Sequence, residues 1–152
     1  MSNGSPALFI DRDGTINHDC PYCHDPSQID IYGDAVSLIK EYREKGFLIV
    51  VITNQSGIGR NYFSVKDMER FNNTLNQILE EYGAQFDYLY YCPHLPEDKC
   101  DCRKPRDGLV RRAVKEHGID LKFSVVAGDR DDIEGELARN LGLPFIHFRR
   151  NL

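Results

Sequence analysis

The sequence has no apolar run long enough to cross a membrane. Its longest run extends only from Phe47 to Ile52, whereas a membrane-spanning helix needs about 20 consecutive apolar residues. Near the N-terminus, the apolar residues Ala7 to Ile10 are followed within a few positions by acidic sequence, which is not typical of a signal peptide. We therefore expect no membrane partner, no signal peptide and a cytoplasmic location.

An excess of positive charge is also lacking. The chain has 19 Lys and Arg residues against 24 Asp and Glu residues, which gives a formal net charge of -5. Proteins that bind nucleic acid usually carry a basic surface, so this composition predicts no nucleic acid partner. The sequence also contains no Gly-x-x-x-x-Gly-Lys-Ser/Thr segment, which disfavours a nucleotide kinase of the P-loop type.

The five cysteines do not suit a disulfide framework. Their number is odd, and we expect no secretory signal that would bring them to an oxidising compartment. We interpret them as reduced thiols or metal ligands.

Strand and helix patterns alternate along the 152 residues, of which 41% are hydrophobic. This length predicts one domain over residues 1–152. Short apolar runs predict strands at residues 7–10, 47–52, 86–91, 123–127 and 145–148, and helical periodicity predicts helices at 35–45, 65–82, 108–117 and about 132–141. Asp34 and Ser64 are candidate helix caps. The alternation predicts a three-layer α/β fold, with a doubly wound parallel sheet covered by helices on both faces.

Polar residues follow the predicted strands, where such a sheet binds its ligands. Asp11 and Asp13 come directly after the first strand, and two carboxylates this close need a cation or a shared proton. Residues 53–60 combine hydroxyl, amide and glycine residues, which suit a phosphate. After the fourth strand, Asp129 is a candidate Mg²⁺ ligand together with Asp11, while Asp131 or Asp132 equally suits a helix cap.

A cluster of sulfur and nitrogen ligands follows the third strand. Cys92, His94, Cys100 and Cys102 supply three thiols and one imidazole, which complete a tetrahedral zinc shell with no open position. We interpret this as a structural zinc that folds its loop and thereby holds Arg103 and Lys104.

Together these segments resemble the signature motifs of the haloacid-dehalogenase superfamily. They are most similar to its zinc-containing branch, which includes the D-glycero-D-manno-heptose 1,7-bisphosphate phosphatases and the histidinol-phosphate phosphatases. The residues that carry the resemblance are 11–17, 52–60, 91–94, 100–105 and 128–129. The resemblance implies a Mg²⁺-dependent phosphatase acting on a small phosphorylated metabolite, with a HAD-like, Rossmann-like fold. This sequence has no insertion large enough for a separate cap domain, so we expect a capless site.

The resemblance also implies residue roles. Asp11 is the expected nucleophile that forms an aspartyl-phosphate, and Asp13 is the expected acid and base whose backbone carbonyl helps to hold Mg²⁺. Thr53 and Lys104 are expected to neutralise the phosphoryl oxygens, and Asp11 with Asp129 to hold the metal. The expected substrate contacts are Asp19, Tyr22, Asn54, Gln55, Ser56 and Arg103.

One departure from the family pattern affects the metal site. The family usually places a second acid four residues after the Asp of its fourth motif, but Ile133 occupies that position here. Either Asp132 or Glu134 must then support the metal. Another departure is Asp107, which adds a negative charge where the family often has proline, so substrate preference is expected to differ.

Two rival functions remain open. Cys20 and Cys23 have the spacing of a glutaredoxin thiol pair, and with His24 they also match a haem-attachment pattern, but no helix is predicted to start there and no export signal is expected. A redox-sensitive or metal-binding loop is the alternative role for this pair. The second rival is a catalytically silent, zinc-stabilised binding module.

The leaving group is not fixed by the sequence. Heptose bisphosphate, histidinol phosphate, another sugar phosphate, and a nucleotide or polynucleotide 3′-phosphate all fit the resemblance, in that order of preference. Without an insertion large enough for a cap domain, we expect a small monomeric enzyme.

Overall fold

The computed structural model describes residues 4–150. Five parallel strands form one sheet in the order β3-β2-β1-β4-β5, as predicted from the alternating pattern. The strands are β1 (Ala7–Ile10), β2 (Leu48–Asn54), β3 (Tyr88–Cys92), β4 (Val125–Gly128) and β5 (Phe145–His147). The chain moves outward from β1 to β3 and then crosses to β4 on the other side of β1. This reversal creates a switch point between β1 and β4, where such sheets bind ligands.

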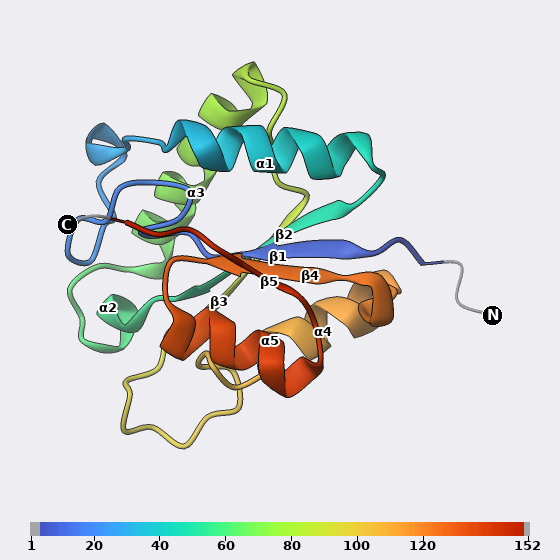
Figure 1. Cartoon of the computed structure of the whole chain (residues 1–152). Coiled ribbons are helices and arrows are strands. Elements are labelled where there is room, and N and C mark those ends of the chain that lie inside the picture. The colour runs from blue at the N-terminus through green and yellow to red at the C-terminus, as the bar shows by residue number, and fades with distance from the viewer. Residues whose placement is uncertain (1–3, 151–152) are drawn as a thin grey trace.

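Helices cover both faces of the sheet. Figure 1 shows α1 (Gly33–Glu44) and α3 (Val65–Glu81) above the strands, with α4 (Gly108–His117) and α5 (Glu136–Leu141) below them. A short helix, α2 (Ser56–Gly59), follows β2 directly. The predicted three-layer α/β fold is therefore confirmed.

The alternation of side chains along β1 explains why both faces are covered. Successive residues of a strand point to opposite faces. Leu8 and Ile10 pack in the core layer on the side of α1 and α3, and Ala7 and Phe9 pack in the layer on the side of α4 and α5. All four are fully buried, so the first strand is central to both layers.

The helix caps agree only in part with the sequence. Ser64 caps α3 through a capping box with Asp67, as its position predicts. Asp34 does not cap α1, because Tyr32 is the N-cap residue and the Asp34 carboxylate instead pairs with Arg150. Likewise, Asp131 and Asp132 make no cap hydrogen bond, since Arg139 and Arg130 bind their carboxylates.

Several elements differ from the predicted ranges. β2 continues to Asn54 because its last residues pair with β3, and α2 was missed because a helix of this length has too few residues for a periodic pattern. β4 begins only at Val125, because Leu121–Phe123 forms a 3-10 turn. The last helix is preceded by a π-helical turn over Asp131–Gly135, and this turn affects the site.

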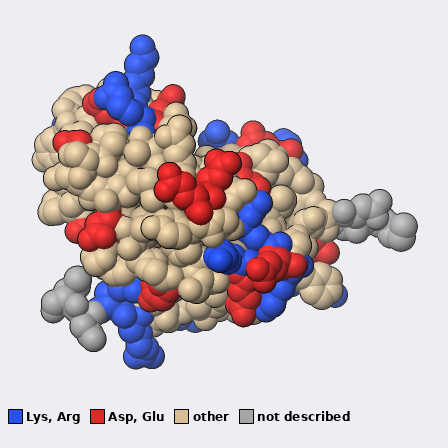
Figure 2. Space-filling view, turned by 90° about the horizontal axis from the view of Figure 1, so that it is seen from above, with Lys and Arg blue, Asp and Glu red and all other residues tan. Residues whose placement is uncertain are grey.

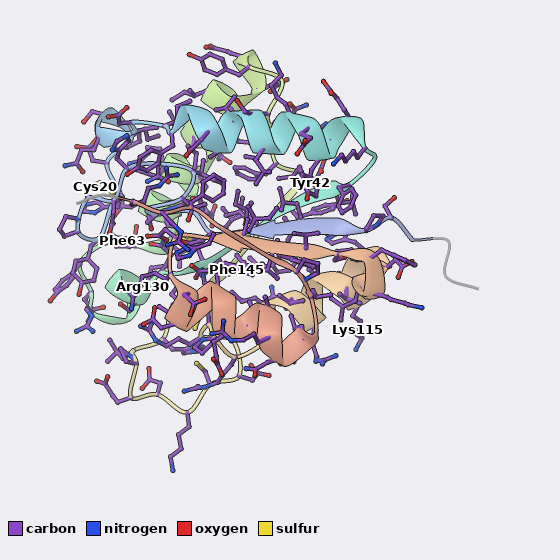
Figure 3. All side chains as sticks on the ribbon, in the orientation of Figure 1. Cys20, Tyr42, Phe63, Lys115, Arg130 and Phe145 are labelled. Atoms are coloured by element: carbon purple, nitrogen blue, oxygen red, sulfur yellow. A yellow bond between two sulfur atoms is a disulfide. The ribbon has the colours of Figure 1, made fainter. Side chains whose placement is uncertain are left out.

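The interpretation of all five cysteines as reduced thiols or metal ligands was wrong for two of them. Cys20 and Cys23 are joined by a disulfide in the loop between β1 and α1. Figure 3 shows Cys20 at the same end of the molecule as Phe63 and Arg130, far from Lys115. The disulfide therefore lies in a loop near the carboxyl ends of the strands. In the sequence, only the close spacing of the two residues indicates this pairing.

The surface that Figure 2 shows carries acidic and basic side chains side by side, with no continuous field of either sign. Among residues 4–150, none of the helices combines the length and the apolar character needed to cross a membrane.

Candidate active site

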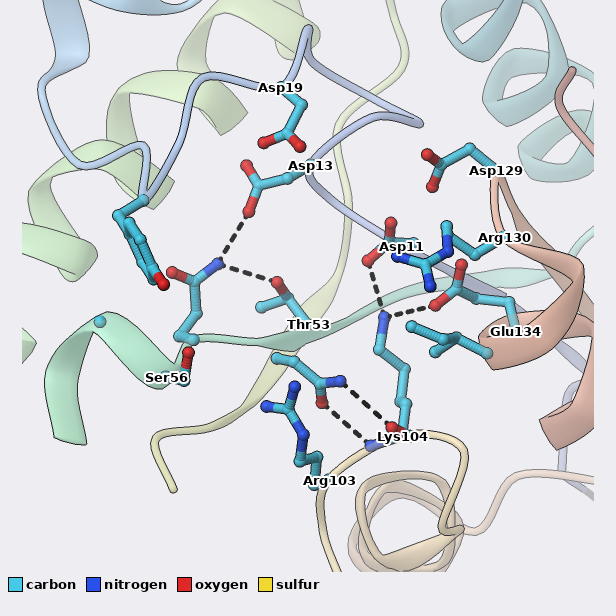
Figure 4. Close-up of a pocket in the computed structure, with 15 residues that line it drawn as sticks. Asp11, Asp13, Asp19, Thr53, Ser56, Arg103, Lys104, Asp129, Arg130 and Glu134 are labelled. Atoms are coloured by element: carbon cyan, nitrogen blue, oxygen red, sulfur yellow. Dashed lines mark hydrogen bonds and ion pairs between the residues drawn. The ribbon is translucent and has the colours of Figure 1, made fainter. Parts of the chain in front are cut away.

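The carboxyl ends of the strands surround a cavity of about 350 Å³. All of the residues that the sequence assigned to catalysis, substrate binding or direct Mg²⁺ binding line it, and Figure 4 draws them and labels most of them. These residues are Asp11, Asp13, Asp19, Tyr22, Thr53, Asn54, Gln55, Ser56, Arg103, Lys104 and Asp129. The lining also includes Gly57, Arg130, Ile133 and Glu134, which were not assigned as substrate contacts.

Lys104 forms the buried centre of this cavity. Its Nζ lies 2.7 Å from Asp11 Oδ1 and 3.0 Å from Glu134 Oε2, and it donates a third bond of 2.8 Å to the Ile52 carbonyl. The lysine side chain is 2% exposed. Burial alone lowers the pKa of a lysine, but Asp11 and Glu134 outweigh it here and raise the pKa of Lys104. The ammonium group therefore remains charged.

Burial has the opposite effect on Asp11. Desolvation raises the pKa of Asp11 well above its usual value, and the nearby carboxylates of Glu134 and Asp13 add to this, although Lys104 acts against it. One ammonium faces several carboxylates, so the site has an excess of negative charge. Such a site favours a bound cation.

Three carboxylates are arranged so that a cation can bind between them. Asp11, Asp129 and Glu134 each offer an oxygen, and these oxygens lie within 4.8 Å of one another. Glu134 Oε1 is buried and has no hydrogen-bond partner among residues 4–150, which leaves it free to accept a cation. Hard oxygen ligands of this kind suit Mg²⁺.

Of the two acids that the sequence left open, Glu134 is the one in the cavity. Asp132 is exposed and its carboxylate is bound by Arg130 at 2.6 and 2.8 Å. Glu134 lies within the π-helical turn, which takes one more residue than an α-helical turn. This extra residue explains why the acid stands at position 134 and Ile133 occupies the position that the family usually gives to an acid.

Gly14 allows Asp129 to approach the loop after β1. Its φ of 84° lies in the left-handed region, and a Cβ atom at this position would lie 2.5 Å from Asp129 Oδ2. Thr15, a residue without a predicted role of its own, donates its hydroxyl to Asp129 Oδ1 at 3.2 Å or to Asp11 Oδ2 at 3.4 Å. The loop thus joins the two acids across the switch point.

Thr53, Gln55 and Asp13 form a second polar group in the cavity. Gln55 Nε2 donates to Thr53 Oγ1 at 2.9 Å and to Asp13 Oδ2 at 3.0 Å. Asn17, which the sequence did not assign, donates to Asp13 Oδ1 at 3.0 Å. Asp13 is therefore held by donors from two strand-end loops.

Asn54 has a different set of contacts. Its amide donates to the Lys104 carbonyl at 3.2 Å and its oxygen accepts from the Lys104 amide at 2.9 Å. Asn54 lines the cavity, but both of its polar atoms are already used to hold the backbone of Lys104. Its contribution is therefore to position the lysine.

The remaining predicted contacts lie around the opening. Tyr22 is 42% exposed, and its backbone adopts a φ of 56°, which is unusual for a residue with a side chain. Burial raises the pKa of Asp19, with Asp13 and Asp129 adding to the effect. Arg103 Nη1 is buried without a hydrogen-bond partner among the described residues, although it lines the cavity. An unpaired guanidinium nitrogen here is suited to an anionic ligand.

The predicted zinc ligands also come together. The ligand atoms of Cys92, His94, Cys100 and Cys102 lie within 4.8 Å of one another. His94 Nδ1 is 3.3 Å from Cys92 Sγ and 3.2 Å from Cys102 Sγ. The cluster immediately precedes Arg103 and Lys104 in the chain, at the start of the segment that carries the buried lysine.

Comparison with known proteins adds three findings at the level of sequence, one family match and two relatives. Residues 17–147 match the family described as Polynucleotide kinase 3 phosphatase. A Thermoplasma volcanium protein named "Probable D-glycero-D-manno-heptose-1,7-bisphosphate 7-phosphatase" is 52% identical over 138 residues, which are 91% of this chain and 94% of that protein. A Haemophilus ducreyi protein named "D-glycero-beta-D-manno-heptose-1,7-bisphosphate 7-phosphatase" is 40% identical over 134 residues, covering 84% of this chain and 74% of the relative.

A solved structure agrees with these relatives. The D,D-heptose 1.7-bisphosphate phosphatase from B. bronchiseptica, complexed with magnesium and phosphate, has a TM-score of 0.82 and 26% sequence identity to this chain. The similarity covers 92% of this chain and 78% of that one.

Proposed function

The chain belongs to the polynucleotide kinase 3 phosphatase family and is a phosphatase of the haloacid-dehalogenase superfamily, and from this premise we propose that it removes the 7-phosphate from D-glycero-D-manno-heptose 1,7-bisphosphate. The observation that carries the proposal is the 52% identity to a relative with this name over 94% of the relative's length. The cavity supports it, because its lining includes the buried ammonium of Lys104 and the buried Arg103 Nη1, which has no hydrogen-bond partner among residues 4–150.

In this proposal Asp11 is the nucleophile. One Asp11 oxygen attacks phosphorus, the bond from phosphorus to the sugar oxygen breaks, and an aspartyl-phosphate forms. Lys104, at 2.7 Å from Asp11 Oδ1, stays protonated and offsets charge on the phosphoryl oxygens. Thr53 also lines the cavity, and its proposed role is to donate its hydroxyl to the phosphoryl oxygens.

Asp13 moves the protons in both steps. It first protonates the leaving sugar oxygen, and the resulting carboxylate then takes a proton from the water that attacks the aspartyl-phosphate. The products are inorganic phosphate, the dephosphorylated sugar and the regenerated Asp11. Asp13 is well placed for this exchange because its side chain is 22% exposed and lies at the cavity.

The residues around Asp11 fit Mg²⁺. Asp11, Asp129 and Glu134, together with the backbone carbonyl of Asp13, would hold the ion, and Glu134 Oε1 is buried and available for it. When bound, Mg²⁺ supplies positive charge that neutralises phosphoryl oxygens and the attacking carboxylate.

The four ligands of the sulfur cluster fit Zn²⁺. Three sulfurs and one nitrogen suit a closed tetrahedral site, and no ligand position remains for a catalytic water. The proposed contribution of Zn²⁺ is structural, since it would hold the segment that leads to Arg103 and Lys104.

The proposed substrate contacts surround the opening of the cavity. Ser56 and Arg103 are suited to a phosphate or to sugar hydroxyls, and Asp19 and Tyr22 to the sugar. Gln55 bonds both Thr53 and Asp13, and Asn54 acts through the backbone of Lys104. We further propose a monomer in the cytoplasm, to be tested by light scattering and by cell fractionation.

The test is phosphate release from a panel of substrates with and without Mg²⁺. The panel contains heptose 1,7-bisphosphate, histidinol phosphate, other sugar phosphates, nucleotides and an oligonucleotide 3′-phosphate, and wild type is compared with Asp11→Asn. We expect Mg²⁺-dependent release, fastest from the heptose bisphosphate and abolished in the variant. A preference for histidinol phosphate would favour the alternative substrate. Release from no compound would favour the silent binding module.

A further inference from the structure

Arg12 is a buried cation to which the reaction described above assigns no role. It stands between Asp11 and Asp13, and its side chain is fully buried. A buried guanidinium is destabilising unless its donors are paired. The partners of this arginine therefore indicate what it does.

The hydrogen bonds of Arg12 connect Asp13 to two other parts of the chain. Its Nε donates to Asp13 Oδ1 and its Nη2 to Asp13 Oδ2, each at 3.0 Å, so the two side chains form a bidentate salt bridge. Nη1 donates to Asn72 Oδ1 on α3 at 2.9 Å, and Nη2 also donates to the Cys23 carbonyl at 3.0 Å. The guanidinium carbon lies 4.3 Å from the centre of the Phe71 ring.

We propose that Arg12 is a positioning residue that sets the orientation of the Asp13 carboxyl group, an inference that rests on the proposed role of Asp13 as acid and base. A carboxylate can rotate about its last side-chain bond. The planar guanidinium group of Arg12 binds both oxygens at once and thereby fixes that rotation. The arginine is itself fixed by α3 through Asn72 and by the disulfide loop through Cys23.

The same contacts select the oxygen that carries the proton. Asp13 Oδ1 already accepts from Arg12 and from Asn17, so both of its lone-pair positions are used. Asp13 Oδ2 accepts from Arg12 and from Gln55, and Gln55 lies at the cavity. When the hydrogen bond from Gln55 to Oδ2 breaks, a lone pair becomes free on Oδ2 and not on Oδ1. The proton that passes to the leaving oxygen is therefore carried on Oδ2.

Arg12 also joins the acid to the loop over the site. The Cys23 carbonyl that it binds belongs to the disulfide loop, which includes Tyr22 and follows Asp19. Tyr22 and Asp19 line the same cavity as Asp13. The orientation of the acid and the position of these two side chains are thus linked through one guanidinium.

The test compares two kinds of leaving group. A sugar or other alkyl alcohol must be protonated as it leaves, whereas 4-nitrophenolate leaves without a proton. We would measure the first step in a single turnover, as release of the alcohol from an alkyl phosphate and as the burst of nitrophenol from 4-nitrophenyl phosphate. The variants are Arg12→Met and Arg12→Lys, with Asp13→Asn as the reference for a lost acid and Arg43→Met as a matched control on α1.

We expect Arg12→Met to slow the alkyl reaction by about 100-fold, which is at the low end of what an acid contributes. Its nitrophenol burst should stay within a few-fold of wild type, and this burst also reports that the variant is folded. Arg12→Lys should not restore the alkyl reaction, because a single ammonium cannot bind both oxygens of Asp13 in the same plane. Arg43→Met should leave both reactions unchanged.

Other outcomes overturn the proposal. Equal losses in both reactions would mean that Arg12 only supports the fold, and no loss in either would mean that Asp13 is oriented without it. If Asp13→Asn itself fails to separate the two leaving groups, the proposed role of Asp13 is wrong and the role of Arg12 falls with it. If the wild-type protein releases neither the alkyl alcohol nor nitrophenol, the proposed phosphatase mechanism itself is overturned.

Discussion

The buried Asp11 carboxylate is an expected weak point in the stability of the metal-free protein. Because burial raises the pKa of Asp11 in the folded state, the folded state binds this proton more tightly than the unfolded chain does. The contribution of Asp11 to stability is therefore present at low pH, where its side chain is protonated, and is lost as the pH rises through the raised pKa. A neutral amide at this position does not titrate.

We therefore predict that Asp11→Asn raises the thermal midpoint of the protein in Mg²⁺-free buffer, and that the gain grows as the pH increases from about 4 to 7. For a chain of this size, each kcal/mol added to the free energy of unfolding raises the thermal midpoint by about 2–4 °C. Lys104 keeps Glu134 as a partner at 3.0 Å in the variant. The control Asp132→Asn should show no gain, since Arg130 lowers the pKa of that exposed carboxylate. A lower midpoint for Asp11→Asn at neutral pH would show that its pair with Lys104 outweighs burial.

At the scale of single residues, the sequence predicted the residues that lie at strand ends and match a motif. Asp11, Asp13, Thr53 and Lys104 were expected in one site, and all line one cavity. The partners of these residues were not predictable, because a hydrogen bond such as that from Arg12 to Asn72 joins positions 60 residues apart. Nothing in the local pattern marks such a pair.

The π-helical turn after β4 is the element that delivers Glu134, and Gly128 gives it room. A Cβ atom at Gly128 would lie 2.4 Å from both Cγ and Oε1 of Glu134. We predict that Gly128→Ala displaces Glu134 from Lys104 and lowers the free energy of unfolding by about 1–3 kcal/mol. It should also weaken Mg²⁺ binding, so that a higher Mg²⁺ concentration is needed for half-maximal activity.

Denaturant unfolding and a Mg²⁺ titration of phosphate release measure the two effects of Gly128→Ala. The matched control is Gly33→Ala, because a Cβ atom at Gly33 meets nothing within 4 Å. Unchanged Mg²⁺ dependence in Gly128→Ala would contradict a metal role for Glu134.

The loop that contains the four proposed zinc ligands has little apolar packing of its own, and all of residues 96–99 are exposed. We predict that removal of zinc by a chelator increases hydrogen exchange in residues 93–104 and abolishes phosphate release, while exchange in β1 and β4 stays protected. Readdition of Zn²⁺ before Mg²⁺ should restore activity. Full activity in a preparation shown to contain no zinc would contradict this structural role.

At the scale of elements, helices with a strong hydrophobic periodicity were predicted from the sequence, and short helices without one were missed. The helix predicted over residues 108–117 is α4, and the long amphipathic pattern from Ser64 is α3 with its cap. Short elements such as α2 and the π-helical turn have too few residues to show a period. Their positions follow from tertiary contacts, such as the close approach of Gly57 to Phe63.

Across the whole molecule, the last described residues are tied to the first loop. Arg150 donates to the carbonyls of Gly14 and Thr15 at 3.0 and 2.9 Å and pairs with Asp34. Its guanidinium carbon lies 3.5 Å from the centre of the Tyr32 ring. These contacts connect the segment after β5 to the loop that carries Asp11 and Asp13.

We predict that Arg150→Ala lowers the free energy of unfolding by about 1–3 kcal/mol, because two buried carbonyls lose a charged donor. Phosphate release should fall as well, since the loop after β1 loses its support. The matched control is Arg149→Ala, which removes an exposed arginine next to it in the chain. Equal effects of the two substitutions in thermal unfolding would contradict a specific role for Arg150.

The parallel sheet also determines how the protein can be attached to a surface. All strands run parallel from the end of the sheet near Pro6 to the end with the cavity, and the last described residue, Arg150, contacts the loop after β1 at the cavity end. A tether at the N-terminal side would leave the cavity facing the solution, where substrate can diffuse in. A tether at the C-terminal side would pull on Arg150 and, through it, on the loop that carries the nucleophile. An immobilised assay or biosensor should therefore use the N-terminal side.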